Sequence, residues 1–467
     1  YAYKKNQKAI FTELSKRGAD ITLKDGNGDS ILHLVSEKGD MTFYKTLAES
    51  NPDLNITNKE GKTPLFLAIE KGKNQFAKML LDQKEKLNLR QKDSRGMSVL
   101  HYLATLKGGV PLLSMIEVNA QWTAEKDVSG RSPLALAVHA NLIDNADFFI
   151  KSGADARGTD WNGSVLVIIA YEKNRAMMNL LLTNGADPDS VNPDGKTLMF
   201  LSIEKNDIAT LKLLAGQKVS INKKYPSGIY PLNHAIDKGR GEMIQFLISS
   251  GAELNNRDDA GNTPLITAAL KSDYKTASLL VAGRADVNIK TGDGKTVLFI
   301  SYEKNRSDIF NLLLTGGAAS TEVHEGGNTL LHLSAQTNKV SFITSLIKNT
   351  AAVNAVNMEG KTPLILAAEK GYPNSVRALI AGAPDLNIKD KSGETALFKC
   401  IKARADAGYS CAELLVKAGA LINDRNGAGN PLLHEAAANE KFSLVSLFLK
   451  NNADANIMNQ SNETLIM

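Results

Sequence analysis

The sequence predicts an all-α solenoid of helix–turn–helix repeats whose connecting turns lie along one edge. Three observations carry this prediction: a period close to 33 residues, a glycine-containing turn followed by Ser or Thr in most periods, and two short apolar segments after each turn. Neither apolar segment can bury its hydrophobic side alone, so neighbouring repeats must stack into one continuous core. We expect the array to be curved and superhelical.

The period is clearest at the residue after the turn, which we name the cap position. It falls at Ser30, Thr63, Ser98, Ser132, Val165, Thr197, Tyr230, Thr263, Thr296, Thr329, Thr362, Thr395 and Pro431, and Thr464 begins one more period. Nine of the thirteen spacings are 33 residues, and the others run from 32 to 36. We therefore expect a single array: residues 1–24 are the second half of a truncated repeat, 25–458 are repeats 1 to 13, and 459–467 start a further repeat.

Each element of a repeat has its own sequence signal. Glycine in the turn permits a positive φ, and Ser or Thr at the cap position is typical of a helix N-cap. A short apolar helix follows, then a polar break and a second helix that ends in a leucine pair and Gly-Ala, as at 179–187 and 413–420. Repeat 12 has three extra residues near 402–410, which we expect to lengthen the turn between its two helices.

A longer period overlies the short one. Segments 194–206 and 293–305 share nine of thirteen residues and lie 99 residues apart. The histidine position, three residues after the cap position, carries phenylalanine at the same interval: Phe200, Phe299 and Phe398. We infer that a block of three repeats was duplicated, with chance similarity among related repeats as the alternative.

The period, the G-x-T-P-L-H signature and the closing G-A-D-x-N resemble ankyrin repeats over essentially the whole chain. Segments 61–72 and 261–270 are close to the family pattern, whereas Val165, Tyr230 and Pro431 depart from it. The resemblance implies an ankyrin solenoid that binds partner proteins along its concave face and turn tips, without catalysis. It also implies that four histidines tie adjacent turns by hydrogen bonds: His33, His101, His332 and His434.

Two other functions remain open. The array could be the targeting or structural part of a larger effector, toxin or enzyme whose active domain lies outside this chain, because host-directed bacterial effectors and latrotoxin-like proteins carry long ankyrin arrays. It could also be the cytosolic tether of a membrane channel, as in some transient-receptor-potential channels. Neither end resembles a polar capping repeat, so we expect the chain to be an excerpt. We favour a cytoplasmic location over secretion as an effector or toxin; the sequence specifies neither the partner nor the oligomeric state.

Motifs for catalysis, metals and cofactors are missing from the sequence. Gly-Lys-Thr at 61, 195, 294 and 360 lacks the glycine five residues earlier that a phosphate-binding loop requires. No His or Cys pair has zinc-site spacing, and no nucleophile–base pair is recognisable. Cys400 and Cys411 are expected to be inert buried thiols, with a local disulfide or a redox switch as the alternative. We predict no enzyme activity and no cofactor for this chain.

The balance of basic and acidic residues argues against nucleic-acid binding. The formal net charge is only +5, and the lysines alternate with acids without an aromatic platform for bases. The longest apolar runs, such as 165–171, stop far short of a membrane-spanning helix, so we expect no membrane insertion by this segment.

A row of Glu-Lys pairs is expected along the concave groove, at the end of each first helix. Its lysines are candidate contacts for an extended, mixed-charge partner: Lys173, Lys205, Lys238, Lys271 and Lys304. The alternative is a solvated ladder in which each exposed pair contributes only about 0–1 kcal/mol.

A second candidate surface lies on the turn tips of repeats 3 to 7. Trp161 occupies a tip where the family normally has a small or charged residue, and Trp, Tyr and Arg are enriched at binding hot spots. Arg95, Met97 and Arg131 occupy the two preceding tips, and Tyr225 lies beside a later one. These residues predict a contact patch, unless Trp161 simply packs on the neighbouring turn.

Overall fold

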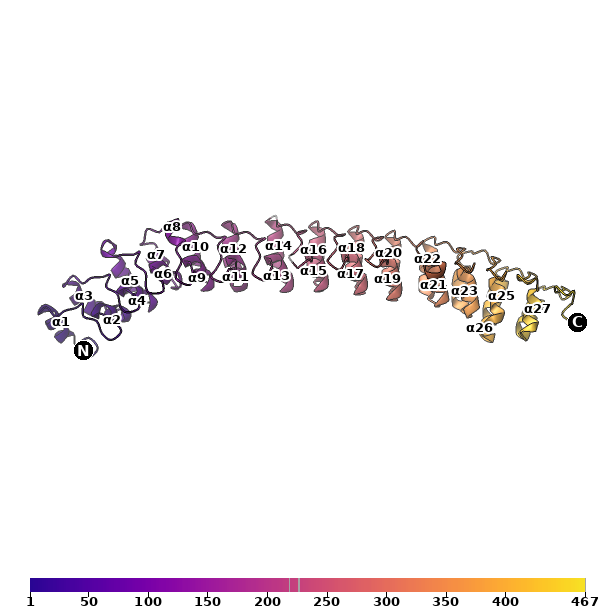
Figure 1. Ribbon diagram of the computed structural model, residues 1–467, viewed down its shortest axis with the longest axis horizontal. Coiled ribbons are helices and arrows are strands. Elements are labelled where there is room, and N and C mark those ends of the chain that lie inside the picture. The colour runs from indigo at the N-terminus through magenta and orange to yellow at the C-terminus, as the bar shows by residue number, and fades with distance from the viewer. Residues whose placement is uncertain (218, 226, 467) are drawn as a thin grey trace. The chain divides into compact units, whose positions relative to one another are not determined.

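Each predicted repeat is observed as a turn followed by packed α-helices. The computed structural model describes residues 1–217, 219–225 and 227–466, and the regular secondary structure of these residues is almost entirely helical. They divide into two compact units, Tyr1–Ser227 and Gly228–Met467, each of which is described by itself. Within each unit, helix pairs follow one another in chain order, and first helices of adjacent repeats pack together (Figure 1).

In the N-terminal unit the helices begin with the predicted half-repeat. They are α1 (Lys8–Lys16), α2 (Ile31–Lys38), α3 (Met41–Ala48), α4 (Pro64–Glu70), α5 (Asn74–Leu81), α6 (Val99–Ala104), α7 (Val110–Leu113), α8 (Ala120–Thr123), α9 (Pro133–His139), α10 (Ile143–Lys151), α11 (Leu166–Lys173), α12 (Arg175–Thr183), α13 (Leu198–Glu204) and α14 (Ile208–Gly216), with a 3₁₀ turn at Lys84–Lys86. Repeat 3 departs from the pattern, because its second helix is reduced to the four residues of α7.

The C-terminal unit is more regular. Its helices are α15 (Pro231–Asp237), α16 (Gly241–Ser249), α17 (Pro264–Leu270), α18 (Tyr274–Ala282), α19 (Val297–Glu303), α20 (Ser307–Thr315), α21 (Leu330–Gln336), α22 (Val340–Lys348), α23 (Pro363–Lys370), α24 (Pro373–Ile380), α25 (Ala396–Lys402), α26 (Ala405–Lys417), α27 (Leu432–Ala438) and α28 (Phe442–Lys450). The turn of repeat 10 forms an antiparallel pair, β1 (Val323–His324) and β2 (Asn328–Thr329), joined by a 3₁₀ turn at Glu325–Gly327.

The three extra residues of repeat 12 do not lengthen a turn, so that expectation was wrong. The turn between α25 and α26 remains short, and α26 has 13 residues where α24 and α28 have 8 and 9. Small residues allow this extension, because a Cβ on Gly408 would lie 2.4 Å from the carbonyl oxygen of Cys400. Residues 459–466 form turns without a helix and Met467 lies outside the described residues, so a further repeat stays a prediction.

A side chain five residues before the cap position, at what we name the turn position, organises most turns. In repeat 3 one oxygen of Asp93 accepts the backbone N–H groups of Arg95 and Met97, both at 2.9 Å. In repeat 11 the side-chain oxygen of Asn357 accepts the corresponding two N–H groups at 3.0 Å. Asp or Asn at this position therefore satisfies turn donors that the backbone leaves unpaired.

The histidines of the signature connect neighbouring repeats, as the family resemblance implies. The Nε2 atoms of His33, His101 and His332 lie 2.9, 3.0 and 3.0 Å from carbonyl oxygens of the next turn. The Nδ1 atom of each ring accepts the N–H of its own cap residue, which completes a capping box. The corresponding bond of His434 is 3.1 Å long.

Phenylalanine at the histidine position replaces this hydrogen bond by a ring contact. The Phe200 ring lies 5.1 Å from the Tyr225 ring in an edge-on arrangement, and the Phe299 ring lies 4.1 Å from the His324 ring in a stacked one. Both partners occupy the turn position of the next repeat, where Asp or Asn is usual. In these repeats a contact between two rings therefore replaces the histidine hydrogen bond as the connection to the next repeat.

Replacing His332 by glutamine is expected to lower the free energy of unfolding of the protein. The replacement should also make that free energy depend less on pH. Burial lowers the pKa of His332, so its contribution is present above the unfolded value of about 6.5 and is lost as the pH falls through the folded pKa. We expect the variant to lose about 1–3 kcal/mol at pH 7. Its destabilisation between pH 7 and pH 5, measured by denaturant unfolding, should be smaller than that of the original protein. An unchanged pH slope would contradict this interpretation.

Candidate functional site

Exposed and half-exposed side chains gather on consecutive turn tips of repeats 3 to 5. We name Arg95, Val128, Arg131 and Trp161 the fingertip face. The tips of repeats 3 and 4 are joined, because the Val128 N–H donates to the Arg95 carbonyl at 2.9 Å. Val128 is 73% exposed and Trp161 is 37% exposed, so both present apolar surface to solvent.

Buried aspartates hold the two arginines of the fingertip face. Arg131 Nε donates to Asp127 Oδ2 at 2.6 Å, and Arg95 Nε donates to Asp93 Oδ2 at 3.2 Å. The Tyr102 hydroxyl reaches the same Asp93 oxygen at 2.7 Å. Burial alone would raise the pKa of Asp127, but hydrogen bonds from Arg131 and Ser129 outweigh it and hold that pKa below its usual value. The guanidinium groups are thus fixed in orientation, which lowers the entropy lost on binding.

Trp161 is positioned by His139, which lies outside the histidine position of the repeat. Its ring lies 4.3 Å from the ring of His139, and His139 Nε2 lies 3.0 Å from Asp160 Oδ2. Asp160 is buried, and its other oxygen accepts the turn N–H groups of Asn162 and Ser164. Trp161 therefore has one face covered by His139 while part of its surface remains exposed.

Two residues predicted for the tip patch are buried. Met97 lies beneath Arg131, with the guanidinium Nη2 at 4.0 Å from the sulfur, and Tyr225 lies against Phe200. This corrects the expectation that both side chains are available to a partner. The physical reason is coverage by a neighbouring repeat, because Arg131 of the next turn lies over Met97 and Phe200 of the preceding repeat lies against Tyr225.

The five candidate lysines of the groove are all exposed, but much of the Glu-Lys row is paired within the chain. The Nζ atom of Lys271 lies 2.6 Å from Oδ1 of Asp237 in the preceding repeat. The Nζ atom of Lys205 lies 4.8 Å from the centre of the Tyr171 ring. Several acids of the row pair instead with a lysine directly before the cap position: Glu70 with Lys62, Glu303 with Lys295 and Glu369 with Lys361. Internal pairing accounts for much of the pattern, and partner binding by the row stays a prediction.

Sequence reasoning missed Val128 and the buried cation Lys399. The signal for Val128 was present, because it stands four residues before its cap position, as Trp161 does. Lys399 stands where most other repeats have an apolar residue, and nothing in the pattern shows that Asp390 and Glu394 surround it.

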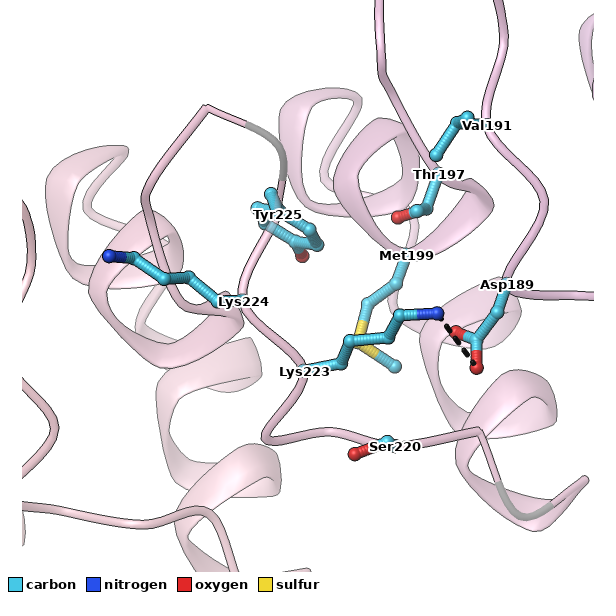
Figure 2. A pocket seen from close by; sticks show the side chains of 8 residues that line it. All are labelled: Asp189, Val191, Thr197, Met199, Ser220, Lys223, Lys224 and Tyr225. Carbon is cyan, nitrogen blue, oxygen red and sulfur yellow. Dashed lines mark ion pairs between the residues drawn. The ribbon is translucent and has the colours of Figure 1, made fainter.

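A cavity of about 190 Å³ lies between the turns of repeats 6 and 7 in the N-terminal unit (Figure 2). It is lined by Asp189, Val191, Thr197, Met199, Ser220, Lys223, Lys224 and Tyr225. Lys223 Nζ lies 3.8 Å from Asp189 Oδ2 across the opening.

Other chemistry is sparse in the part of the chain that the structure describes. Those residues contain no cluster of three or more His, Cys, Asp or Glu side chains that could hold a metal ion. Cys400 and Cys411 are free and buried. No helix among the described residues is long and apolar enough to cross a bilayer.

The fold defines a helical repeat protein, and the family comparisons state which kind. A model of three ankyrin repeats matches residues 1–93, 166–258, 304–390, 331–426 and 376–461, and a single-repeat model matches 260–292. These matches cover more than half of the sequence, so the chain belongs to the ankyrin-repeat family.

The individual relatives have low sequence identity to this chain, and each aligns with only part of it. The human transient receptor potential cation channel subfamily A member 1 is 25% identical over 153 residues, 32% of this chain and 14% of the channel. A putative ankyrin repeat-containing protein of Treponema pallidum is 30% identical over 117 residues, 24% of this chain and 39% of that protein. The crystal structure of the ankyrin repeat domain of Bcl-3 is 25% identical, with a TM-score of 0.40, and covers 44% of this chain and 93% of that domain. The chain thus spans 39% or less of these two curated relatives.

Proposed function

We propose that this chain is a non-enzymatic protein-binding scaffold whose partner contacts the fingertip face and the adjacent concave side. Ankyrin repeats are generally protein-interaction scaffolds, and their fold is typically not catalytic. The observation that carries the proposal is the fingertip face, which combines a partly exposed Trp161, an exposed Val128 and two oriented arginines. Such residues are typical of hot spots.

The residues that the family models leave unmatched also support the fingertip face as the binding surface. The models omit residues 94–165, which contain the shortened α7 and the whole fingertip face. Residues 94–165 are therefore the longest segment without a family match, and exposed apolar and arginine side chains gather within it. Specialised recognition is a physical reason for the missing match, because a binding surface depends on tip residues while the stacking core does not.

The alternative is that the array targets or tethers a larger protein, such as an effector, a toxin, an enzyme or a channel. This alternative is supported by the larger size of the relatives, because the chain covers only 14% of the human channel and 39% of the Treponema protein. The intact mass of the native protein separates the two: about 50.3 kDa supports a free-standing scaffold, and a much larger mass supports the alternative.

The double variant Trp161→Ala, Arg131→Glu tests the fingertip face. A photoreactive amino acid at Val128 would first identify the partner by cross-linking, and calorimetry would then measure its affinity. We expect Trp161→Ala alone to weaken binding at least 10-fold and the double variant to weaken it further, because a truncated hot-spot Trp costs about 2 kcal/mol or more.

The control is Phe442→Ala, which removes a 76% exposed aromatic ring from the C-terminal unit. It should leave the affinity unchanged, and circular dichroism should show that every variant is folded. Unchanged affinity in a folded double variant would overturn the assignment of the surface.

A further inference from the structure

The cavity between repeats 6 and 7 combines an apolar interior with a charged opening (Figure 2). Met199 and Tyr225 are buried and form its inner surface, and Val191 adds a half-exposed apolar wall. Lys223 and Asp189 stand at the opening, where their ion pair of 3.8 Å is longer than a hydrogen bond. The Lys223 ammonium can therefore accept a second, closer carboxylate.

Two departures from the repeat pattern shape this cavity. Met199 stands two residues after the cap position, where eleven of the thirteen repeats have leucine. Tyr225 stands at the turn position, and its ring packs on Phe200 where an Asp or Asn would cap the turn. Methionine adapts its shape and makes favourable sulfur–aromatic contacts, so both departures favour a bound ring.

The corresponding space between repeats 4 and 5 provides a comparison within the same unit. It measures about 160 Å³ and is lined by Leu134, Leu166 and Lys126 among others, without an aromatic ring or a methionine. Its existence, with Lys126 and Asp155 in its lining, shows that a gap with one lysine and one aspartate belongs to the repeat geometry, whereas the ring and the sulfur belong to the cavity between repeats 6 and 7.

We propose that this cavity binds a single apolar group of phenyl or branched-alkyl size that carries a carboxylate, with the apolar group against Met199 and the carboxylate at Lys223. An apolar cavity of about 150 Å³ in a protein holds benzene, so 190 Å³ accommodates a ring and a short stem. Lys223 places a positive charge at the opening that Asp189 engages only at 3.8 Å, which favours an anion there. The same chemistry exists in a free aromatic acid and in the C-terminal residue of a peptide.

Methyl NMR of the full chain labelled at methionine tests the site directly. The Met199 resonance is assigned by its loss in Met199→Leu, which restores the residue usual at this position. Titration with 3-phenylpropanoate should shift this resonance with a millimolar dissociation constant, and neutral 3-phenylpropan-1-ol should bind at least 10-fold more weakly. The peptide acetyl-Gly-Gly-Phe and its C-terminal amide distinguish the sources, because tighter binding of the peptide acid indicates a chain terminus and tighter binding of 3-phenylpropanoate indicates a free acid.

Two variants and one control complete the test. Lys223→Gln should weaken 3-phenylpropanoate binding about 5- to 10-fold, and Val191→Trp, which fills the opening from an exposed position, should abolish it. Lys126→Gln, at the comparison space, should change nothing. Equal binding of the acid and the alcohol, or no shift of Met199 at the solubility limit of the acid, would overturn the proposal. The fingertip face is unaffected by either result, since none of its residues lines this cavity.

Discussion

Replacing Lys399 by methionine is expected to destabilise the C-terminal unit by about 3–5 kcal/mol. Lys399 lies on α25 with only 5% of its side chain exposed, and its Nζ lies 2.6 Å from Asp390 Oδ2 and also contacts Glu394. Both acids are largely buried, and Asp390 additionally accepts two turn N–H groups. Removing the cation would leave two buried carboxylates facing each other without their main counter-charge.

The pH dependence of this effect has a definite sign. Burial alone would raise the pKa values of Asp390 and Glu394, but hydrogen bonds from Lys399 outweigh it and lower both. Their contribution is therefore present above the unfolded values near 4 and is lost as the pH falls through the lower folded values. Burial alone would lower the pKa of Lys399, but its two acidic partners raise it, so its contribution persists until the pH rises above about 10.5. In Lys399→Met the carboxylates lose their cation and should protonate more easily, so the variant should approach the original protein in stability between pH 7 and pH 5.

Urea unfolding at several pH values measures this prediction. Lys402→Met is the matched control, since Lys402 binds the same Glu394 at 2.8 Å but has a side chain that is mostly exposed. It should cost no more than about 1 kcal/mol. Adding Glu394→Leu to Lys399→Met should recover part of the loss, because an apolar residue removes one of the two buried carboxylates that faced Lys399. Equal effects of the two lysine substitutions would contradict the buried-pair interpretation.

Replacing Phe342 by alanine is expected to cost about 3–5 kcal/mol, through lost apolar burial and the cavity that remains. Phe342 lies on α22 and is almost fully buried. Its ring lies 4.7 Å from Phe310 of α20 and 5.4 Å from Tyr302 of α19, both edge-on. One side chain therefore connects repeats 9 and 10.

The effect of Phe342→Ala should be local. Each repeat of a solenoid contacts only its neighbours, so hydrogen exchange should accelerate most in α19 to α22 and less in α25 to α28. Phe442→Ala, which removes an exposed ring from α28, should cost less than about 0.5 kcal/mol. A uniform acceleration across the unit would show that it unfolds as one cooperative body and would contradict the nearest-neighbour description.

The sequence by itself determined the repeat, the cap positions at which the first helices begin, and the histidine links. These features depend on residues close in the chain: Thr63 at the cap position, Pro64 after it, and His33, which reaches the turn of the next repeat at a constant interval. A pattern that recurs every 33 residues reveals such local chemistry without coordinates. The sequence also placed Trp161, Arg95 and Arg131 on turn tips, where the structure has them exposed at least in part.

Only the tertiary structure decided which side chains face solvent and which charges meet. Met97 and Tyr225 are as close to the tips as Arg95 in sequence, yet Arg131 of the next turn covers Met97 and Phe200 of the preceding repeat covers Tyr225. The extra residues of repeat 12 became helix because Gly408 allows close packing on α25, a contact that no local pattern encodes. Lys399 is stable inside the unit because Asp390 and Glu394 of the preceding turn point at it. Periodicity fixes where a backbone element lies, whereas burial and pairing depend on distances between side chains across elements, which the period does not specify.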